Sequence, residues 1–216
     1  MTRTADTGAK QACVAGLLLA AGGGRRLGGR PKALLEHRGE LLVEHAVRVL
    51  REGGCGPVHV VLGAGAAEVR ARLGAPVADV VLVDNPHWAR GMASSLTAGL
   101  ASLAELPGVP AVVVTLVDQP YVGAAAVARV VAAHRAGSSL AAAAYGGVRG
   151  HPVLFGREHW AEVARTASGD RGARAYLRQH AAAVRLVECS DVAAPDDIDV
   201  PDDLALLERR LERRLE

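Results

Sequence analysis

Short apolar runs alternate along this chain with longer segments whose apolar residues have helical spacing. The apolar runs lie at 12–18, 58–62, 79–83, 112–117, 140–144, 153–155 and 184–187. The helical segments lie at 42–52, 66–73, 92–104, 124–135, 158–166 and 171–180. Short, mostly apolar runs are typical of strands buried on both faces. Their alternation with helices predicts an α/β fold, a Rossmann-like three-layer α/β/α arrangement with a mostly parallel sheet.

The length of the chain favours one domain. Half of its 216 residues are hydrophobic, which is enough for one core and does not demand two. We expect a disordered tail at 1–11 and a single domain at 12–216. Leu204, Leu207, Leu211 and Leu215 form one stripe of an amphipathic C-terminal helix, which we expect to pack on the sheet, with a contact to a partner as the alternative.

A glycine-rich basic loop follows the first apolar run. Residues 19–32 read Leu-Ala-Ala-Gly-Gly-Gly-Arg-Arg-Leu-Gly-Gly-Arg-Pro-Lys. Glycines after a buried strand let backbone N–H groups point at an anion, and the arginines and Lys32 add positive charge. The loop is therefore a candidate triphosphate site, and a solvated surface loop is the alternative.

The spacing of this loop excludes two common nucleotide-binding motifs. A Walker loop needs Gly-Lys followed by Ser or Thr, whereas Lys32 stands between Pro31 and Ala33. A dinucleotide fingerprint needs a third glycine at position 27, which is Leu, and an acid after the next strand, where Leu62 and Gly63 stand. A nicotinamide or flavin enzyme is therefore the weaker alternative.

Composition narrows the partners and the compartment. A net charge of +2 is too balanced for a nucleic-acid-binding face or a polybasic membrane anchor. The apolar stretch at 12–21 is too short to span a bilayer, and a basic loop rather than a cleavage site follows it. Three scattered cysteines make no disulfide framework. We expect a cytoplasmic monomer that binds neither nucleic acid nor membrane.

Two aspartates are candidate metal ligands. Asp118 directly follows the apolar run 112–117, so its carboxylate is placed where a strand ends. Mg²⁺ on a nucleotide takes one or two carboxylates, with phosphate oxygens completing its shell. Asp199 is the natural second carboxylate. Ordinary turn chemistry for Asp118 and helix capping for Asp199 are the alternatives.

Four motifs, in order over nearly the whole chain, resemble one family. They are Leu19-Ala-Ala-Gly with Arg26-Leu-Gly and Lys32, then Asn85-Pro-His-Trp with Gly91-Met and Ser94-Ser-Leu, then Asp118-Gln-Pro, then Asp197-Ile-Asp-Val-Pro-Asp-Asp-Leu. Together they resemble the MobA-like nucleotidyltransferases, and within them most closely the molybdenum cofactor cytidylyltransferases.

This resemblance implies a reaction and its catalytic residues. A terminal phosphate of molybdopterin would attack the α-phosphorus of CTP, and pyrophosphate would leave. Arg26 and Lys32 would stabilise charge on the phosphates. Asp118 and Asp199 would hold the Mg²⁺ ion.

The resemblance also implies the nucleotide contacts. They are Leu19, Ala20, Ala21, Gly22, Gly23, Gly24, Arg25, Gly28, Asn85, Ser94 and Ser95. Ser94 has a second interpretation as a helix N-cap. The sequence Leu-Ala-Ala-Gly, rather than Leu-Ala-Gly-Gly, favours CTP over GTP. The family often has Ser or Thr where Gly24 stands, and a small residue where Val117 stands, so these two positions depart from its pattern.

The acceptor contacts follow from the same resemblance. The segment 150–153, with His151, and the segment 168–174, with Asp170, resemble family segments that line the pterin pocket, and Gln119 of the Asp-Gln-Pro motif is a further acceptor contact. A structural role for His151 and helix capping by Asp170 remain alternatives. Asp197, Asp202 and Asp203 are expected to be solvated neighbours of Asp199.

Other functions stay open at this point. The runner-up is a related nucleotidyltransferase that uses GTP or acts on a sugar or alcohol phosphate. A non-enzymatic alternative is a chaperone that hands molybdenum cofactor to a molybdoenzyme acceptor. Neither Ser-His-Asp, Cys-His nor zinc-type spacing is present in the sequence, so hydrolase chemistry lacks its residues.

Overall fold

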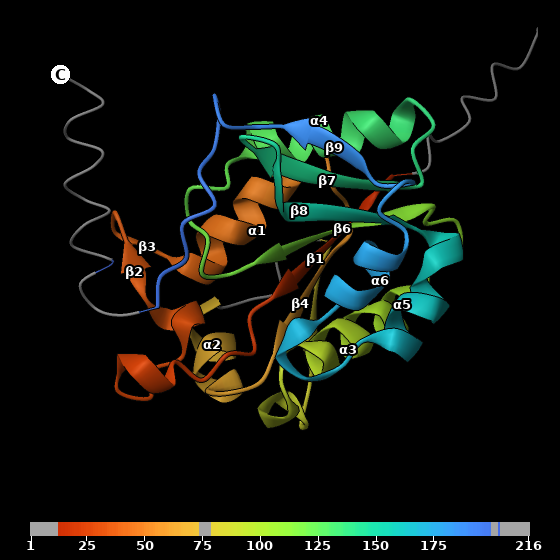
Figure 1. Cartoon of the computed structure of the whole chain (residues 1–216). Coiled ribbons are helices and arrows are strands. Elements are labelled where there is room, and N and C mark those ends of the chain that lie inside the picture. Colours follow the sequence, from red (N-terminus) through yellow and green to blue (C-terminus); the bar gives the residue numbers. More distant parts are fainter. Residues whose placement is uncertain (1–12, 74–78, 200–202, 204–216) are drawn as a thin grey trace, which may run out of the picture.

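A seven-stranded sheet in the order β5-β4-β1-β6-β8-β7-β9 forms the centre of the computed structural model, which describes residues 13–73, 79–199 and 203 (Figure 1). Its strands are β1 (Ala15–Leu19), β4 (Val58–Leu62), β5 (Val80–Asp84), β6 (Ala111–Leu116), β7 (Leu140–Tyr145), β8 (Val148–Gly156) and β9 (Arg185–Glu188). Strand β8 is antiparallel to β6 and β7, and the other neighbours are parallel. The expected mostly parallel sheet is confirmed.

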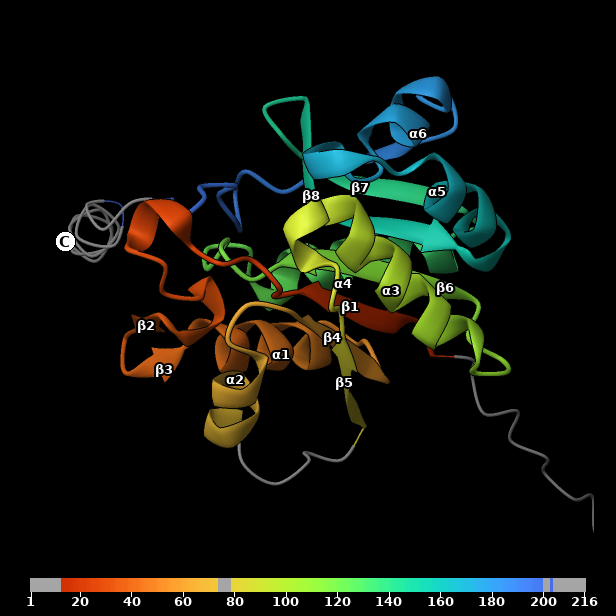
Figure 2. The same ribbon diagram turned by 90° about the horizontal axis from the view of Figure 1, so that it is seen from below.

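Helices cover both faces of the sheet (Figures 1 and 2). They are α1 (Leu42–Glu52), α2 (Ala66–Leu73), α3 (Met92–Ala104), α4 (Ala124–Arg135), α5 (Trp160–Thr166) and α6 (Arg174–Gln179). Short 3₁₀ turns are η1 (Arg25–Leu27), η2 (Lys32–Leu34), η3 (Trp88–Arg90), η4 (Arg157–His159) and η5 (Gly169–Arg171). The side chains of α1 and α4 pack on one face, and those of α3, α5 and α6 on the other. The three-layer α/β/α architecture is confirmed.

Alternation along the central strands separates two apolar cores. In β1, Leu18 belongs to the core under α1 and α4, whereas Leu17 belongs to the core under α3. The outer strands differ from the expectation of burial on both faces, because Val81 of β5 is 41% exposed and Leu186 of β9 is 49% exposed. An outer strand has a neighbour on one side only, and the flanking helices centre on the inner strands.

Two hairpins extend beyond the expected elements. Strand β8 begins at Val148 rather than 153 and pairs with β7 through Gly146 and Gly147, whose φ angles are 60° and 80°. A two-residue turn with both φ positive matches the twist of paired strands. A small hairpin of β2 (Glu36–His37) and β3 (Glu40–Leu41) was not predicted, because its strands are too short to give a pattern.

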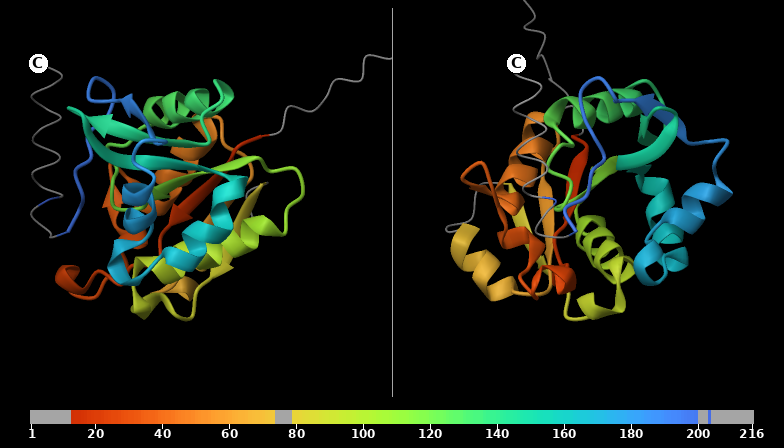
Figure 3. Two further views of the ribbon diagram at one scale, coloured as in Figure 1. Left: turned by 45° about the vertical axis from the view of Figure 1, so that its right-hand side comes forward. Right: turned by 60° about the vertical axis from the view of Figure 1, so that its left-hand side comes forward.

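The chain after β9 returns to the end of β6. In Figures 1 and 3 this blue segment runs from β9 along the molecule toward the loop that follows β1. The Ile198 backbone N–H donates to the Asp118 carbonyl at 2.9 Å, and the Ile198 side chain is fully buried. This return places residue 199 beside residue 118. The expected tail at 1–11 and helix from 204 lie outside the described residues.

None of the helices in the described part of the chain has the length and apolar character needed to cross a bilayer.

Candidate active site

The glycine-rich loop leaves the carboxyl end of β1 in a conformation that depends on Gly24. Gly24 and Gly28 flank η1 with φ angles of 55° and 70°, in the left-handed region that favours glycine. A Cβ atom on Gly24 would overlap the Arg30 carbonyl oxygen. The absence of Ser or Thr at this position therefore has a steric reason, because this loop conformation has no room for a side chain.

Lys32 lies between the two predicted metal ligands. Its Nζ donates to Asp118 Oδ2 at 2.6 Å and to Asp199 Oδ1 at 2.7 Å. The buried side chains of Ala33 and Leu34 anchor the turn that carries Lys32. Arg26 Nη1 lies 3.4 Å from Asp199 Oδ2, with its side chain 75% exposed. Three segments that are far apart in sequence thus come together at the edge of the sheet where the sequence predicts the loop and Asp118. They contribute Arg26 and Lys32, Asp118, and Asp199.

Opposite charges in this cluster stabilise each other's ionised forms. Burial alone lowers the pKa of Lys32, but the carboxylates of Asp118 and Asp199 outweigh it, and the pKa is raised from its usual value. The hydrogen bond from Lys32, aided by its charge and that of Arg26, lowers the pKa of Asp199. The ammonium and the Asp199 carboxylate therefore stay charged over a wider pH range than in water.

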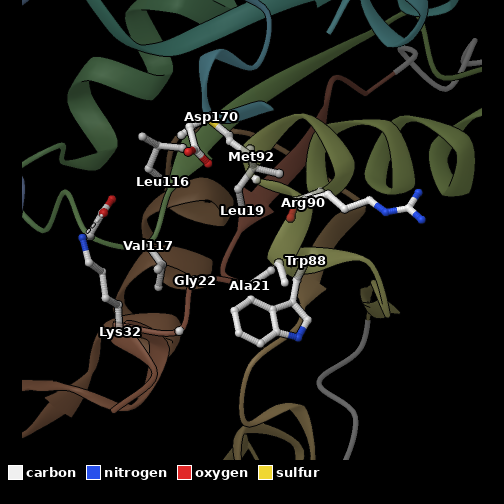
Figure 4. A pocket seen from close by; sticks show the side chains of 15 residues that line it. Leu19, Ala21, Gly22, Lys32, Trp88, Arg90, Met92, Leu116, Val117 and Asp170 are labelled. Atoms are coloured by element: carbon white, nitrogen blue, oxygen red, sulfur yellow. Dashed lines mark hydrogen bonds and ion pairs between the residues drawn. The ribbon is translucent and has the colours of Figure 1, made fainter. Parts of the chain in front are cut away.

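A cavity of about 400 Å³ opens between the loop and α3 (Figure 4). It is lined by Leu19, Ala21, Gly22, Gly23, Lys32, Trp88, Ala89, Arg90, Gly91, Met92, Ser95, Leu116, Val117, Asp118 and Asp170. Figure 4 shows Lys32 on the left, Asp170 at the top and Trp88 on the right, with the Arg90 side chain extending away from the centre. We call this hollow the loop cavity. It brings together the predicted nucleotide contacts Leu19, Ala21, Gly22, Gly23 and Ser95.

Asn85 and Ser94 do not line the loop cavity. Asn85 is 4% exposed, and its Nδ2 donates to the hydroxyls of Ser94 at 2.9 Å and Ser95 at 3.1 Å. Both Asn85 and Ser94 border a separate surface hollow beside Gly169. Ser94 Oγ also bonds the Gly91 carbonyl oxygen at 2.9 Å. Asn85 therefore fixes the chain around Ser95 rather than lining the cavity.

Four other predicted nucleotide contacts also stand apart from the loop cavity, and one of them is Gly24, which is absent from the lining. Ala20 is buried in the core on the α1 and α4 side of the sheet, and its N–H donates to the Val61 carbonyl at 3.0 Å. Gly28 ends η1 and is absent from the lining. The backbone of Arg25 lies in η1, and its side chain is outside the described part of the structure.

A second cavity of about 350 Å³ adjoins the first, and we call it the acceptor cavity. The two share the lining residues Leu19, Met92, Leu116 and Asp118. Of the predicted acceptor contacts, Gln119 and His151 line this second cavity, whereas Asp170 lines the loop cavity instead. Asp118 is therefore placed on the wall between two adjoining spaces.

Burial sets the ionisation of groups in the acceptor cavity. It lowers the pKa of His151 to about 4, against the opposing charge of Asp118, so the imidazole is neutral at pH 7. The Tyr145 hydroxyl donates to the His151 carbonyl at 2.7 Å and fixes the backbone there. A neutral imidazole can both donate and accept a hydrogen bond.

Asp197 lies in the wall of the acceptor cavity, which the sequence does not indicate. It was expected to be a solvated neighbour, but it lines the acceptor cavity and accepts a hydrogen bond from Gln119 Nε2 at 2.7 Å. Burial raises the pKa of Asp197 despite this bond, and the charges of Asp118 and Asp199 add to the rise. Asp203 also differs, because its Oδ2 accepts from the Asp199 N–H at 2.8 Å. The other expected neighbour, Asp202, lies outside the described residues.

The carboxylates fit a divalent metal shared with a nucleotide. Oxygens of Asp118 and Asp199 flank a single cation, the Lys32 ammonium, so the site already accommodates positive charge between them. The described residues contain no cluster of three His, Cys, Asp or Glu side chains that could enclose a metal. Two carboxylates leave the remaining positions to phosphate oxygens and water, as Mg²⁺ or Mn²⁺ requires.

A glycine-rich loop, cationic side chains and paired carboxylates at the carboxyl end of a parallel sheet define a nucleotidyltransferase, and solved nucleotidyltransferases share this fold. The model of the MobA-like NTP transferase domain matches residues 16–184, so the chain belongs to the MobA-like NTP transferase family. Family resemblance and fold, both expected from the sequence, are confirmed.

Individual relatives have different names. The nicotine blue oxidoreductase of Paenarthrobacter nicotinovorans is 42% identical over 194 residues, which cover 87% of this chain and 92% of that protein. A probable molybdenum cofactor guanylyltransferase of Opitutus terrae is 51% identical over 53 residues, covering 24% of this chain and 26% of that protein. The manganese complex of Rv0371c from Mycobacterium tuberculosis H37Rv is 29% identical with a TM-score of 0.71, covering 90% of this chain and 97% of the other.

Proposed function

We propose that this protein transfers CMP from CTP to the phosphate of molybdopterin or molybdenum cofactor, with Mg²⁺, and releases pyrophosphate. The observation that carries the proposal is the position of Lys32, Asp118 and Asp199 where the loop cavity meets the acceptor cavity. One space takes the nucleotide and the other the acceptor. The reaction takes place in the cytoplasm in a monomer, and a molybdoenzyme receives the product.

The chemistry needs position and charge rather than a covalent intermediate. An oxygen of the acceptor phosphate forms a bond to the α-phosphorus of CTP, and the bond from that phosphorus to the bridging oxygen breaks. The electron pair leaves with pyrophosphate. Lys32 and Arg26 offset the negative charge that builds on the phosphates. When bound, Mg²⁺ held by Asp118 and Asp199 supplies a Lewis acid at the same place.

The loop cavity supports the choice of a pyrimidine nucleotide. Ala21, Gly22 and Gly23 present backbone groups to it, and Ser95 adds a hydroxyl group. Backbone amides and a hydroxyl provide the donors and acceptors that a cytosine edge needs. Leu19-Ala-Ala-Gly is the sequence that favours CTP over GTP within the family. The relative named as a guanylyltransferase makes GTP the competing nucleotide.

A pyrophosphate-release assay tests this proposal. Purified protein with Mg²⁺ and molybdopterin is expected to release pyrophosphate from CTP faster than from GTP. Asp118→Asn and Lys32→Met should slow the release by about 10³-fold, whereas Asp84→Asn, which removes an exposed carboxylate paired with Arg70, should leave it unchanged. A faster reaction with GTP or with a sugar phosphate would show that the proposal is wrong. Cofactor binding without any pyrophosphate would indicate a chaperone.

The name of one relative supports a second candidate function. The nicotine blue oxidoreductase matches over 92% of its length, so reduction of a heteroaromatic dye by a nicotinamide cofactor is the alternative. In that reaction the dye takes two electrons, and NADH or NADPH is oxidised. Loss of NADH absorbance with nicotine blue, in the absence of CTP, would favour this alternative. We expect no such loss, since the dinucleotide fingerprint is absent from the loop.

A further inference from the structure

Three arginines line the acceptor cavity, and none of them forms an ion pair with a carboxylate in the described part of the chain. Arg149 of β8, Arg171 of η5 and Arg174 of α6 all line it. Within residues 13–73 and 79–199, no hydrogen bond or ion pair engages these three guanidinium groups. Arg129 and Arg165, by contrast, pair with carboxylates on the surface. The cavity thus gathers cations that the fold itself does not use.

Two of these cations repel each other. Burial lowers the pKa of Arg149, and the nearby charge of Arg174 lowers it further. Of the two carboxylates in the same lining, Asp118 pairs with Lys32 and Asp197 accepts a hydrogen bond from Gln119, and neither forms an ion pair with an arginine of the cavity. Like charges held together in a partly buried place are stabilised when an anion lies between them.

The rest of the cavity wall restricts the class of ligand. Its apolar part includes Leu96, Val114, Val153, Phe155 and Leu177. These side chains favour a flat or apolar body rather than a heavily hydrated one. His151, which is neutral at pH 7, adds a polar group without adding charge. The wall therefore suits a molecule with a ring-like body and a separate anionic group.

We propose that Arg149 and Arg174 bind the phosphate monoester of the acceptor inside the acceptor cavity, whose wall toward the loop cavity contains Asp118. This inference rests on the proposed function and adds the residues that select the acceptor. Planar guanidinium groups match phosphate oxygens with paired hydrogen bonds, which a lysine cannot reproduce. A phosphate bound there lies in the cavity that meets the nucleotide site.

The arginines also address a physical difficulty of the reaction. The attacking group and the triphosphate are both anions, so bringing them into contact is opposed by repulsion. Lys32 and Arg26 offset the charge on the nucleotide side. Arg149 and Arg174 offset it on the acceptor side, which allows the phosphate oxygen to approach the α-phosphorus.

Phenyl phosphate, a small aromatic phosphate monoester, tests the inference by calorimetry. The full chain is first saturated with Mg²⁺ and α,β-methylene CTP, so that the triphosphate site is filled. Phenyl phosphate is then expected to bind about tenfold more weakly to Arg149→Gln and to Arg174→Gln. Arg178→Gln serves as the matched control, because it removes the same charge from α6 at a position outside the cavity lining.

Each outcome decides the matter. Unchanged affinity for phenyl phosphate in the Arg149→Gln/Arg174→Gln double variant would overturn the inference. So would complete loss of phenyl phosphate binding in the presence of the CTP analogue, or a wild-type affinity for benzoate equal to that for phenyl phosphate. A second measurement needs no variant. If the affinity of the wild type for phenyl phosphate falls as the salt concentration rises, while its affinity for phenol does not, the inference is supported. Arginine-dependent binding together with failed pyrophosphate release would disprove the proposed function and leave the anion site standing.

Discussion

Replacing Lys32 by Met tests whether the charge cluster forms in solution. Lys32→Met keeps the length of the side chain and removes the cation between Asp118 and Asp199. The two carboxylates then face each other without the ammonium that separates them. We expect a less stable apo protein whose stability Mg²⁺ restores, because a bound metal replaces the missing positive charge.

The size of the effect follows from the geometry. At an effective dielectric constant of about 20, ion pairs at 2.6 and 2.7 Å each gain about 6 kcal/mol of Coulomb energy, which desolvation largely offsets. Asp199 is 49% exposed, so that pair contributes about 0.5 kcal/mol, as surface pairs do. The pair with Asp118, with the side chains 15% and 21% exposed, contributes about 2 kcal/mol. The sum corresponds to a loss of about 5–10 °C in Tm.

Urea unfolding with and without millimolar Mg²⁺ measures both effects. The control is Arg48→Gln, which removes exposed pairs with Glu40 and Glu52 and should cost less than about 0.5 kcal/mol with no response to Mg²⁺. If Lys32→Met unfolds at the wild-type urea concentration, the cluster does not contribute to stability. If Mg²⁺ stabilises Lys32→Met no more than it stabilises Arg48→Gln, the metal does not take the place of the ammonium.

Three further predictions concern neighbouring residues. Asp118→Asn is expected to lose Mn²⁺ binding, measured by electron paramagnetic resonance, and about 10³-fold in transfer rate; retained Mn²⁺ affinity would remove Asp118 from the metal site. Gly24→Ser should cost about 1–3 kcal/mol in urea unfolding, because its left-handed φ and the Arg30 carbonyl oppose a side chain. Asp197→Asn should stabilise the protein at pH 7 but not at pH 3, since a raised folded-state pKa means that stability falls as the carboxyl ionises with rising pH. Equal urea midpoints for Asp197→Asn and wild type at pH 7 would contradict this.

The sequence predicts the parts of the site that depend on where strands end. The loop after β1 and Asp118 after β6 lie together because the carboxyl ends of neighbouring parallel strands meet at one edge. The pairing of β1 with β6 was not needed for that inference, only their shared direction. Asp199 was added by its motif, and the structure brings it to the same edge through the returning segment.

Side-chain direction accounts for most of what the sequence did not predict. Asn85 belongs to one of the four motifs that carry the family resemblance, yet its amide turns inward and donates to the hydroxyls of Ser94 and Ser95. No local sequence pattern marks Arg149 as a binding residue, because the proposed anion site also needs Arg174, which lies on another element. Contacts between residues far apart in sequence leave no local periodicity, so neither composition nor spacing reveals them.

The late position of Asp199 in the chain has a consequence for protein synthesis. The ribosome makes Lys32 first, and Asp199 follows 167 residues later, after all seven strands of the sheet have been made. A growing chain can therefore complete its sheet while Lys32 still lacks one of its two carboxylate partners. A chain that stops short of residue 199 lacks one of the two proposed metal ligands. A prematurely terminated product would therefore be inactive rather than an enzyme with altered activity.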